Sequence, residues 1–154
     1  MNLATKFLSV IPILLFTHGA KAQDSFTFGL GLGTAYSGLG VNIGLLSELD
    51  MKYISVGCLR YTESNATCGA GLGWIKTDLF DTSSNKHGLG VYIGAVGTEN
   101  SFYSSEIING VGLGYYYFFN GIADPGFNLG FTLVAGKGDN SSGGGALFQM
   151  GYQF

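Results

Sequence analysis

The chain has 154 residues, and only 11% of them are charged, against about 25% in an average soluble domain. Its formal net charge of −3 provides no basic face for nucleic acid, so a nucleic-acid partner is not expected. Apolar residues make up 46%, which argues against disorder, and the 27 glycines are spread along the chain rather than gathered in a linker.

The amino terminus has the features of a cleaved secretory signal. Lys6 precedes an apolar run over residues 7–16, and the small residues Ala20 and Ala22 follow it. A run of about ten residues is too short for a membrane-spanning helix, which needs about 20. We expect residues 1–22 to be a signal peptide and residues 23–154 to form one mildly acidic domain. A buried amino-terminal helix is the alternative.

The rest of the chain alternates apolar with small or polar residues in eight stretches. They cover residues 25–36, 38–47, 51–61, 67–79, 88–97, 107–119, 126–137 and 146–154. The fifth stretch is representative, with Leu89, Val91, Ile93 and Ala95 in one phase and glycines, Tyr92 and Val96 in the other. A period of two predicts β-strands with one apolar face, and turn-rich sequences separate the stretches.

The two cysteines lie in the third and fourth stretches. Cys58 and Cys68 are equally far from Glu63, so a hairpin centred there places them opposite each other in the apolar phase. Directly opposed residues can have Cα atoms about 4.5 Å apart, which a disulfide accepts. We expect a Cys58–Cys68 disulfide, with two unpaired thiols as the alternative. Only His87 would remain as a histidine after cleavage, so neither a metal site nor a cofactor is expected.

The last nine residues close the pattern and end on an aromatic residue. Their apolar phase is Ala146, Phe148, Met150, Tyr152 and Phe154, and their other phase contains Leu147, Gln149, Gly151 and Gln153. One face suits lipid and the other suits a packed lumen. A carboxy-terminal strand that ends on Phe is characteristic of the closing strand of a bacterial outer-membrane barrel.

Stretches of about ten residues suit tilted membrane strands, and an even number closes a sheet without an unpaired edge. In this pattern and in its terminal residues, the chain resembles the small bacterial outer-membrane β-barrels, the class of OmpX-like and Opa-like proteins and the OmpA transmembrane domain. The expected fold class is therefore all-β, an eight-stranded antiparallel up-and-down transmembrane β-barrel with short loops.

The resemblance implies secretion across the inner membrane and a place in the outer membrane of a Gram-negative bacterium. It also implies contact with outer-membrane lipids, including lipopolysaccharide, and insertion by the barrel-assembly machinery. The assembly signal would consist of the terminal residues Phe148, Met150, Tyr152 and Phe154. With both termini periplasmic, the odd-numbered stretches run outward.

This orientation gathers aromatic residues near the periplasmic rim, where amphipathic rings are favoured. The predicted lipid-facing belt consists of Phe26, Phe28, Trp74, Tyr115, Tyr117, Phe119 and Phe127, together with Tyr152 and Phe154. Tyr36, Phe102 and Tyr103 are the candidates for the opposite rim. Aromatic packing in an ordinary soluble core is the alternative.

The inward phase argues against a general porin, because it has no charge in the predicted membrane zone and contains Tyr53, Tyr92 and Tyr116 beside many glycines. The glycines either make room for these rings or leave a small cavity. His87 is not followed by the His-x-Ser pattern of lipid A deacylases, so no enzyme is expected.

The sequence thus favours a small, non-enzymatic, monomeric barrel of structural or surface-interaction type. The alternatives are a secreted soluble barrel that binds a small apolar ligand and a lipid A-modifying enzyme.

Overall fold

A computed structural model describes residues 25–62, 65–80, 84–100, 105–139 and 141–154 of the chain. In this part, eight strands form a closed barrel in which each strand pairs antiparallel with the next and β8 pairs with β1. The strands are β1 (Ser25–Gly33), β2 (Gly38–Leu46), β3 (Asp50–Tyr61), β4 (Ala66–Lys76), β5 (His87–Asn100), β6 (Ser105–Phe118), β7 (Gly126–Lys137) and β8 (Ser142–Gln153). The all-β, up-and-down architecture expected from the sequence is confirmed. The predicted signal peptide, residues 1–22, lies outside the described residues.

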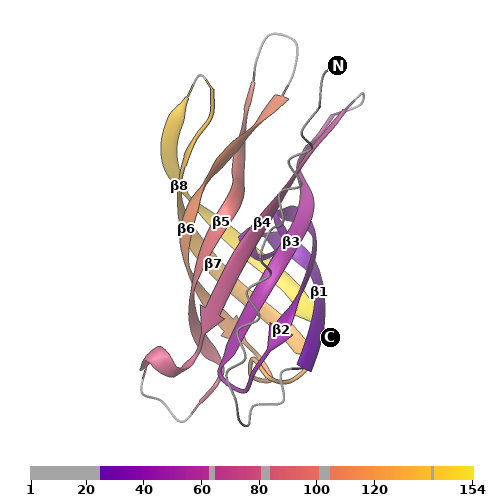
Figure 1. Cartoon of the computed structure of the whole chain (residues 1–154), viewed down its shortest axis with the longest axis vertical. Helices are drawn as coiled ribbons and strands as arrows, with labels where there is room; N and C mark the ends of the chain where they lie inside the picture. Colours follow the sequence, from indigo (N-terminus) through magenta and orange to yellow (C-terminus); the bar gives the residue numbers. More distant parts are fainter. Residues whose placement is uncertain (1–24, 63–64, 81–83, 101–104, 140) are drawn as a thin grey trace, which may run out of the picture.

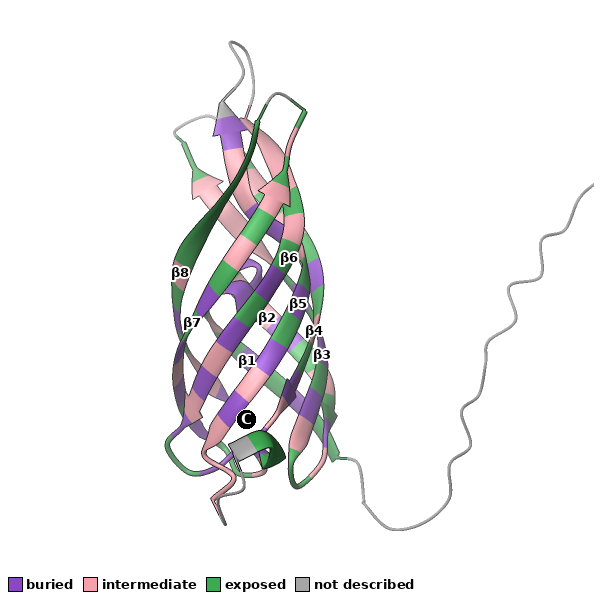
Figure 2. Ribbon diagram, turned by 90° about the vertical axis from the view of Figure 1, so that its left-hand side faces the viewer, coloured by how far each residue is buried: buried purple, intermediate pink, exposed green. Residues whose placement is uncertain are grey.

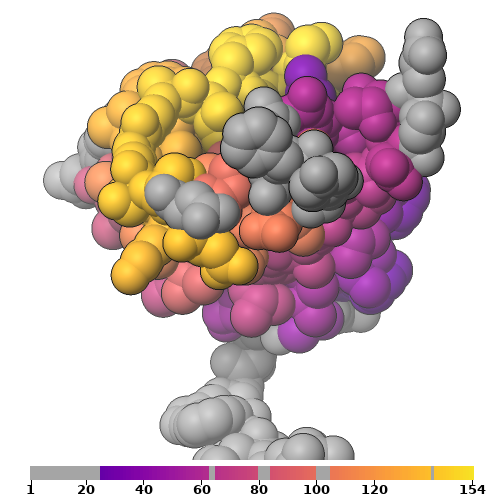
Figure 3. Space-filling view, turned by 90° about the horizontal axis from the view of Figure 1, so that it is seen from above, coloured from indigo at the N-terminus to yellow at the C-terminus, as the bar shows by residue number. Residues whose placement is uncertain are grey.

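The barrel has two distinct rims. At the terminal rim, drawn at the bottom of Figure 1, β1 begins and β8 ends. The β3–β4, β5–β6 and β7–β8 hairpins project at the other end, the hairpin rim, which Figure 3 shows from above with β8 in yellow and β3 and β4 in magenta on opposite sides. Two short 3-10 turns, η1 (Thr34–Tyr36) and η2 (Asp78–Phe80), complete the described structure. No helix in the described ranges combines the length and hydropathy needed to cross a bilayer.

The strands place polar side chains inside the barrel and large apolar side chains outside it, visible as alternating bands of burial in Figure 2. The buried polar residues include Thr27, Asn42, Ser55, Asn128, Thr132, Gln149 and Gln153. The exposed apolar residues include Leu30, Leu39, Ile54, Leu72, Ile93, Val111, Leu133 and Phe148. The barrel also encloses an apolar core, but it exposes many large apolar residues that a soluble domain would bury.

The chain leaves the wall of the barrel after β1, where the sequence predicted a strand as far as residue 36. β1 ends at Gly33, and the positive φ angles of Gly33 (110°) and Gly38 (103°) let the chain turn into and out of the lumen. Tyr36, predicted at the rim opposite the aromatic belt, is instead fully buried, and that prediction is wrong. Phe102 and Tyr103 lie outside the described residues.

Other boundaries also differ from the sequence pattern, and β4 ends at Lys76 and not at residue 79. β8 begins at Ser142 and not at Ala146, because residues 142–145 continue the pairing with β7. β5 and β6 extend their pairing to Asn100 and Ser105, into the segment that separates the fifth and sixth predicted stretches. The register shift between Ala95 and Gly97 changes the phase of β5, so Ala95, expected in the outward phase, is buried.

Candidate functional site

The lumen is plugged by the turn between β1 and β2. Thr34, Ala35, Tyr36 and Ser37 are each at most 3% exposed, although they belong to a connection between strands. Loops normally run over the surface, because buried backbone groups need partners. The sequence does not reveal this plug, because residues 34 and 36 continue the alternation of β1.

One side of the plug is held by β7 and β8. The hydroxyl of Thr34 donates to Oε1 of Gln149 at 3.0 Å and shares a hydrogen bond with Thr132 at 2.8 Å. The hydroxyl of Tyr36 donates to Oδ1 of Asn128 at 3.1 Å and accepts from its Nδ2 at 2.9 Å. Buried polar groups are therefore used to fix the turn relative to two distant strands.

The other side is held by β2, β3 and β5. Nδ2 of Asn42 donates to the carbonyl of Ala35 at 3.0 Å. Oγ of Ser37 lies 2.8 Å from Oγ of Ser55 and 2.9 Å from the hydroxyl of Tyr92. The plug thus hydrogen-bonds to five of the eight strands, which makes it the centre of the polar network of the lumen.

The inward glycines around the plug make room for it and for the large rings. A Cβ on Gly31 or Gly151 would overlap the ring of Tyr36, and one on Gly71 or Gly73 would overlap Tyr92 or Tyr53. With Met51, Ile75, Tyr116 and Phe118, these rings form the buried core. In the middle of the barrel, the glycines therefore make room for large rings and do not leave a cavity.

An open pocket lies nearer the hairpin rim. Its volume is about 280 Å³, and Val96, Ile108, Val134 and Leu147 contribute to its lining. A Cβ on Gly143 or Gly145 of β8 would meet no atom within 4 Å. Gly143 and Gly145 are exposed, so this space is open to the outside of the barrel and is not an enclosed cavity.

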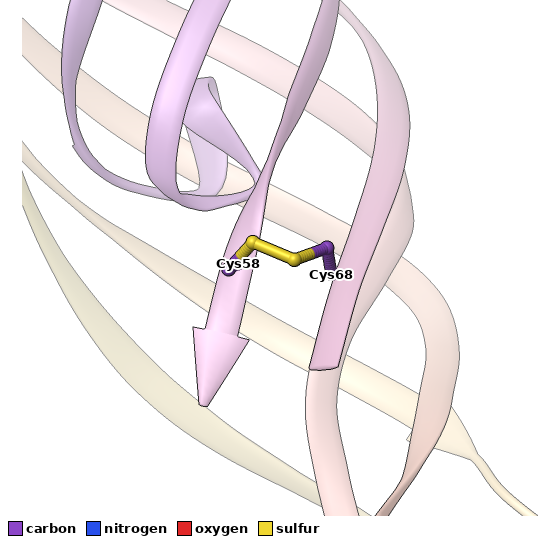
Figure 4. The surroundings of a disulfide bond; sticks show 2 residues. All are labelled: Cys58 and Cys68. Carbon is purple, nitrogen blue, oxygen red and sulfur yellow. A yellow bond between two sulfur atoms is a disulfide. The ribbon is translucent and has the colours of Figure 1, made fainter. Parts of the chain in front are cut away.

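The predicted disulfide is confirmed. Cys58 of β3 and Cys68 of β4 are directly paired in the register and are bonded through their sulfur atoms (Figure 4). The two cysteines are ten residues apart in sequence, and their bond lies on the outward face. It links β3 and β4 near the hairpin turn between Tyr61 and Ala66. A groove of about 600 Å³ lies beside it at the hairpin rim, lined by Asn65, Thr67, Glu106, Asp139 and their neighbours.

The carboxy-terminal residues lie on the outer surface where β8 meets β1 and β7. Tyr152 and Phe154 have ring centroids 4.7 Å apart, and Phe28 and Phe127 extend the contact to either side at 5.8 and 5.0 Å. Phe148 and Met150 are exposed on the same face. The amide of Phe154 donates to the carbonyl of Phe28 at 2.7 Å, so the last residue takes part in closing the barrel.

The predicted belt residues are all at the terminal rim, but they form separate groups. A second group consists of Tyr115 and Tyr117 of β6 and Phe119, which directly follows this strand. The ring centroids of Tyr117 and Phe119 are 5.2 Å apart. Phe26 and Trp74 lie over β1 to β4 and belong to neither group. The ring of His87 packs 5.1 Å from Tyr117, and its Nδ1 is 2.6 Å from the hydroxyl of Tyr115. His87 is the first residue of β5.

Trp74 has two cations beside it. Nζ of Lys52 and Nζ of Lys76 lie 5.9 and 5.7 Å from its ring centroid. Asp50 and Asp78 accompany the lysines at 4.0 and 3.1 Å, respectively. An apolar groove of about 420 Å³ begins at Lys52 and includes Phe26, Ile43, Leu45, Ile54 and Leu72 in its lining. Sequence reasoning placed Trp74 in the belt but missed the paired charges, which only the β3–β4 register brings together.

Comparison with family models, with curated proteins and with solved structures gives no match for this chain.

Proposed function

We propose that this protein is a small outer-membrane β-barrel of structural or surface-interaction type, similar to the small bacterial outer-membrane barrels, and that it has no enzymatic activity. The observation that carries the proposal is the distribution of side chains. Large apolar residues cover the outside of a closed barrel, and a network of polar residues is buried within it beside the core rings. Closure leaves no unpaired edge along the paired strands, which is the condition for β-structure in lipid.

The outer surface supports a particular orientation in the membrane. Aromatic groups and both described chain ends gather at the terminal rim, where a membrane interface favours amphipathic rings. The terminal rim would then face the periplasm, and the hairpin rim would face the outside. Lipopolysaccharide and other outer-membrane lipids would surround the wall, and the barrel-assembly machinery would recognise the strand that ends at Phe154.

The filled lumen argues against a general diffusion pore in this proposal. The plug and the rings of Tyr53, Tyr92 and Tyr116 occupy the middle of the barrel. The hairpin rim carries a groove beside the disulfide, and Glu106 and Asp139 contribute to its lining. A rigid hairpin next to a polar groove suits contact with another molecule, which favours the surface-interaction version.

Replacing Leu133 by Arg tests membrane insertion directly. Leu133 is outward-facing on β7 and 57% exposed, so a soluble barrel would tolerate the change. In a membrane barrel, Arg near the bilayer midplane costs about 2–4 kcal/mol. We expect Leu133→Arg to lower the folded, heat-modifiable form in the outer-membrane fraction.

Asn109→Arg provides the matched control, because Asn109 is exposed on β6 nearer the hairpin rim. It should assemble like the wild-type protein. Recovery of the wild-type protein in the soluble periplasm, with Leu133→Arg folding normally, would contradict the proposal and favour a secreted soluble barrel. A change in lipid A mass spectra on overexpression would instead favour the lipid-modifying enzyme.

A further inference from the structure

We propose that the outer surface over β1 to β4 at the terminal rim binds one phospholipid with a primary ammonium headgroup, of the phosphoethanolamine type. The proposal rests on the proposed function, because only a barrel embedded in a bilayer meets a lipid side-on. Three tiers of side chains lie toward the rim, and the second and third overlap, because Asp50 is paired with Lys76. Their order, apolar, cationic and acidic, matches the acyl chains, the phosphate and the ammonium group of such a lipid.

The apolar tier is the groove on the outer surface. Its volume of about 420 Å³ is within the range of about 300–1,000 Å³ that ligand sites usually have. Phe26, Leu45 and Ile54 come from three adjacent strands, which lie side by side in Figure 1. The groove contains no acidic residue, and its one charged residue, Lys52, stands at the end nearer the terminal rim. An acyl chain can therefore lie along it without burying a charge.

The cationic tier is fixed by the pairing of β3 with β4. The register places Ile54 opposite Leu72, then Lys52 opposite Trp74, then Asp50 opposite Lys76. Both ammonium groups lie within 6 Å of the indole centroid of Trp74. Lysine is a flexible point charge with three donors, so both side chains can reach one phosphate group beside the indole.

The acidic tier overlaps the cationic tier at the rim, because Asp50 is paired with Lys76 and only Asp78 lies beyond it. Asp50 is the first residue of β3, and Asp78 follows the end of β4. Their carboxylates lie 4.0 Å from Nζ of Lys52 and 3.1 Å from Nζ of Lys76, on partly exposed side chains. A headgroup whose phosphate sits between the lysines would therefore direct its terminal group toward two carboxylates.

The balance of charge selects the headgroup. Two lysines and two aspartates sum to zero, so a headgroup with a net negative charge would meet repulsion from the carboxylates as well as attraction from the lysines. A zwitterion meets attraction in both tiers. A primary ammonium also donates hydrogen bonds to carboxylates, which a quaternary ammonium lacks the protons to do. The site therefore suits phosphatidylethanolamine better than phosphatidylcholine or phosphatidylglycerol.

Native mass spectrometry of the full protein, purified from membranes in detergent, tests this selectivity. Phosphatidylethanolamine, phosphatidylcholine and phosphatidylglycerol with identical acyl chains are titrated separately, and the lipid-bound fraction is measured. We expect phosphatidylethanolamine to bind about tenfold more tightly than either competitor, the effect of about one additional charge-assisted hydrogen bond. Equal binding of the three lipids, or preference for phosphatidylglycerol, would overturn the proposal.

Two double variants assign the tiers. Lys52→Gln with Lys76→Gln should lower the affinity for all three lipids, whereas Lys137→Gln, at the hairpin rim, should not. Asp50→Asn with Asp78→Asn should abolish the preference for phosphatidylethanolamine over phosphatidylcholine. Each variant is first checked for the folded, heat-modifiable form. Wild-type affinity in the lysine variant, or wild-type selectivity in the aspartate variant, would refute the site while leaving membrane insertion intact, so this failure is distinct from failure of the proposed function.

Discussion

Replacing Gly151 by alanine tests whether the plug is packed as tightly as its contacts indicate. Gly151 is an inward residue of β8, and a Cβ there would lie 2.6 Å from Cε2 of Tyr36 and closer still to Cζ and Oη. Tyr36 has no exposed surface, and its hydroxyl is bonded to Asn128. The ring therefore has to shift, which breaks that bond or strains the wall.

The cost is the sum of two effects. Overpacking a filled core costs about 1–3 kcal/mol, and a buried hydroxyl and amide left unpaired cost about 1–3 kcal/mol more. We expect Gly151→Ala to lower the free energy of unfolding by about 2–6 kcal/mol. Urea unfolding in detergent micelles, followed by the fluorescence of Trp74, the single tryptophan of the chain, measures the change.

Gly145→Ala is the matched control, because Gly145 lies on the same strand and in the same phase but meets no atom within 4 Å. It should unfold at the wild-type urea concentration. If both variants unfold at the same midpoint, the plug is not packed against β8 and the reasoning fails.

Reduction of the Cys58–Cys68 bond should lower stability by about 2–3 kcal/mol, the entropy of closing a short loop, seen as a lower urea midpoint with reductant; an unchanged midpoint would contradict this. Deletion of Phe154 removes its bond to the carbonyl of Phe28 and should reduce the folded, heat-modifiable form in membranes, whereas Phe154→Tyr should retain it. Wild-type levels of the deletion variant would argue against a role for this residue in assembly. Glu99 accepts hydrogen bonds from the amide of Asp139 and the hydroxyl of Ser141. Glu99→Gln weakens these charge-assisted bonds and should speed hydrogen exchange at the Asp139 amide. Equal exchange rates in the variant and the wild-type protein would refute the role of the carboxylate.

The period of two predicted most of the barrel because strand alternation is a local property. Each residue of β7, for example, faces inward or outward as its position in the sequence requires, from Phe127 outside to Thr132 inside. The opposed cysteines followed from the same logic, because a symmetric hairpin sets the register around its centre. The predicted strand ends were less accurate where two strands continue to pair beyond the apolar alternation, as β5 and β6 do.

The plug could not be predicted in this way. Thr34 and Tyr36 match the alternation of β1, and nothing local distinguishes a strand that continues from a chain that turns into the lumen. What decides it is the space left by glycines on distant strands and the polar partners on β7 and β8, including Gln149 and Asn128. Those neighbours are about 100 residues away in sequence, so only the closed barrel brings them together.

The sequence by itself determined that eight amphipathic strands exist and which face of each is apolar, because alternation and turn residues act within a few positions. Tertiary structure decided what fills the barrel and which charges meet on its surface. The group of Lys52, Trp74 and Lys76 depends on the pairing of β3 with β4, and the burial of Tyr36 depends on closure of β8 against β1. Both arise from contacts between strands, whose register and spacing are set by the barrel as a whole.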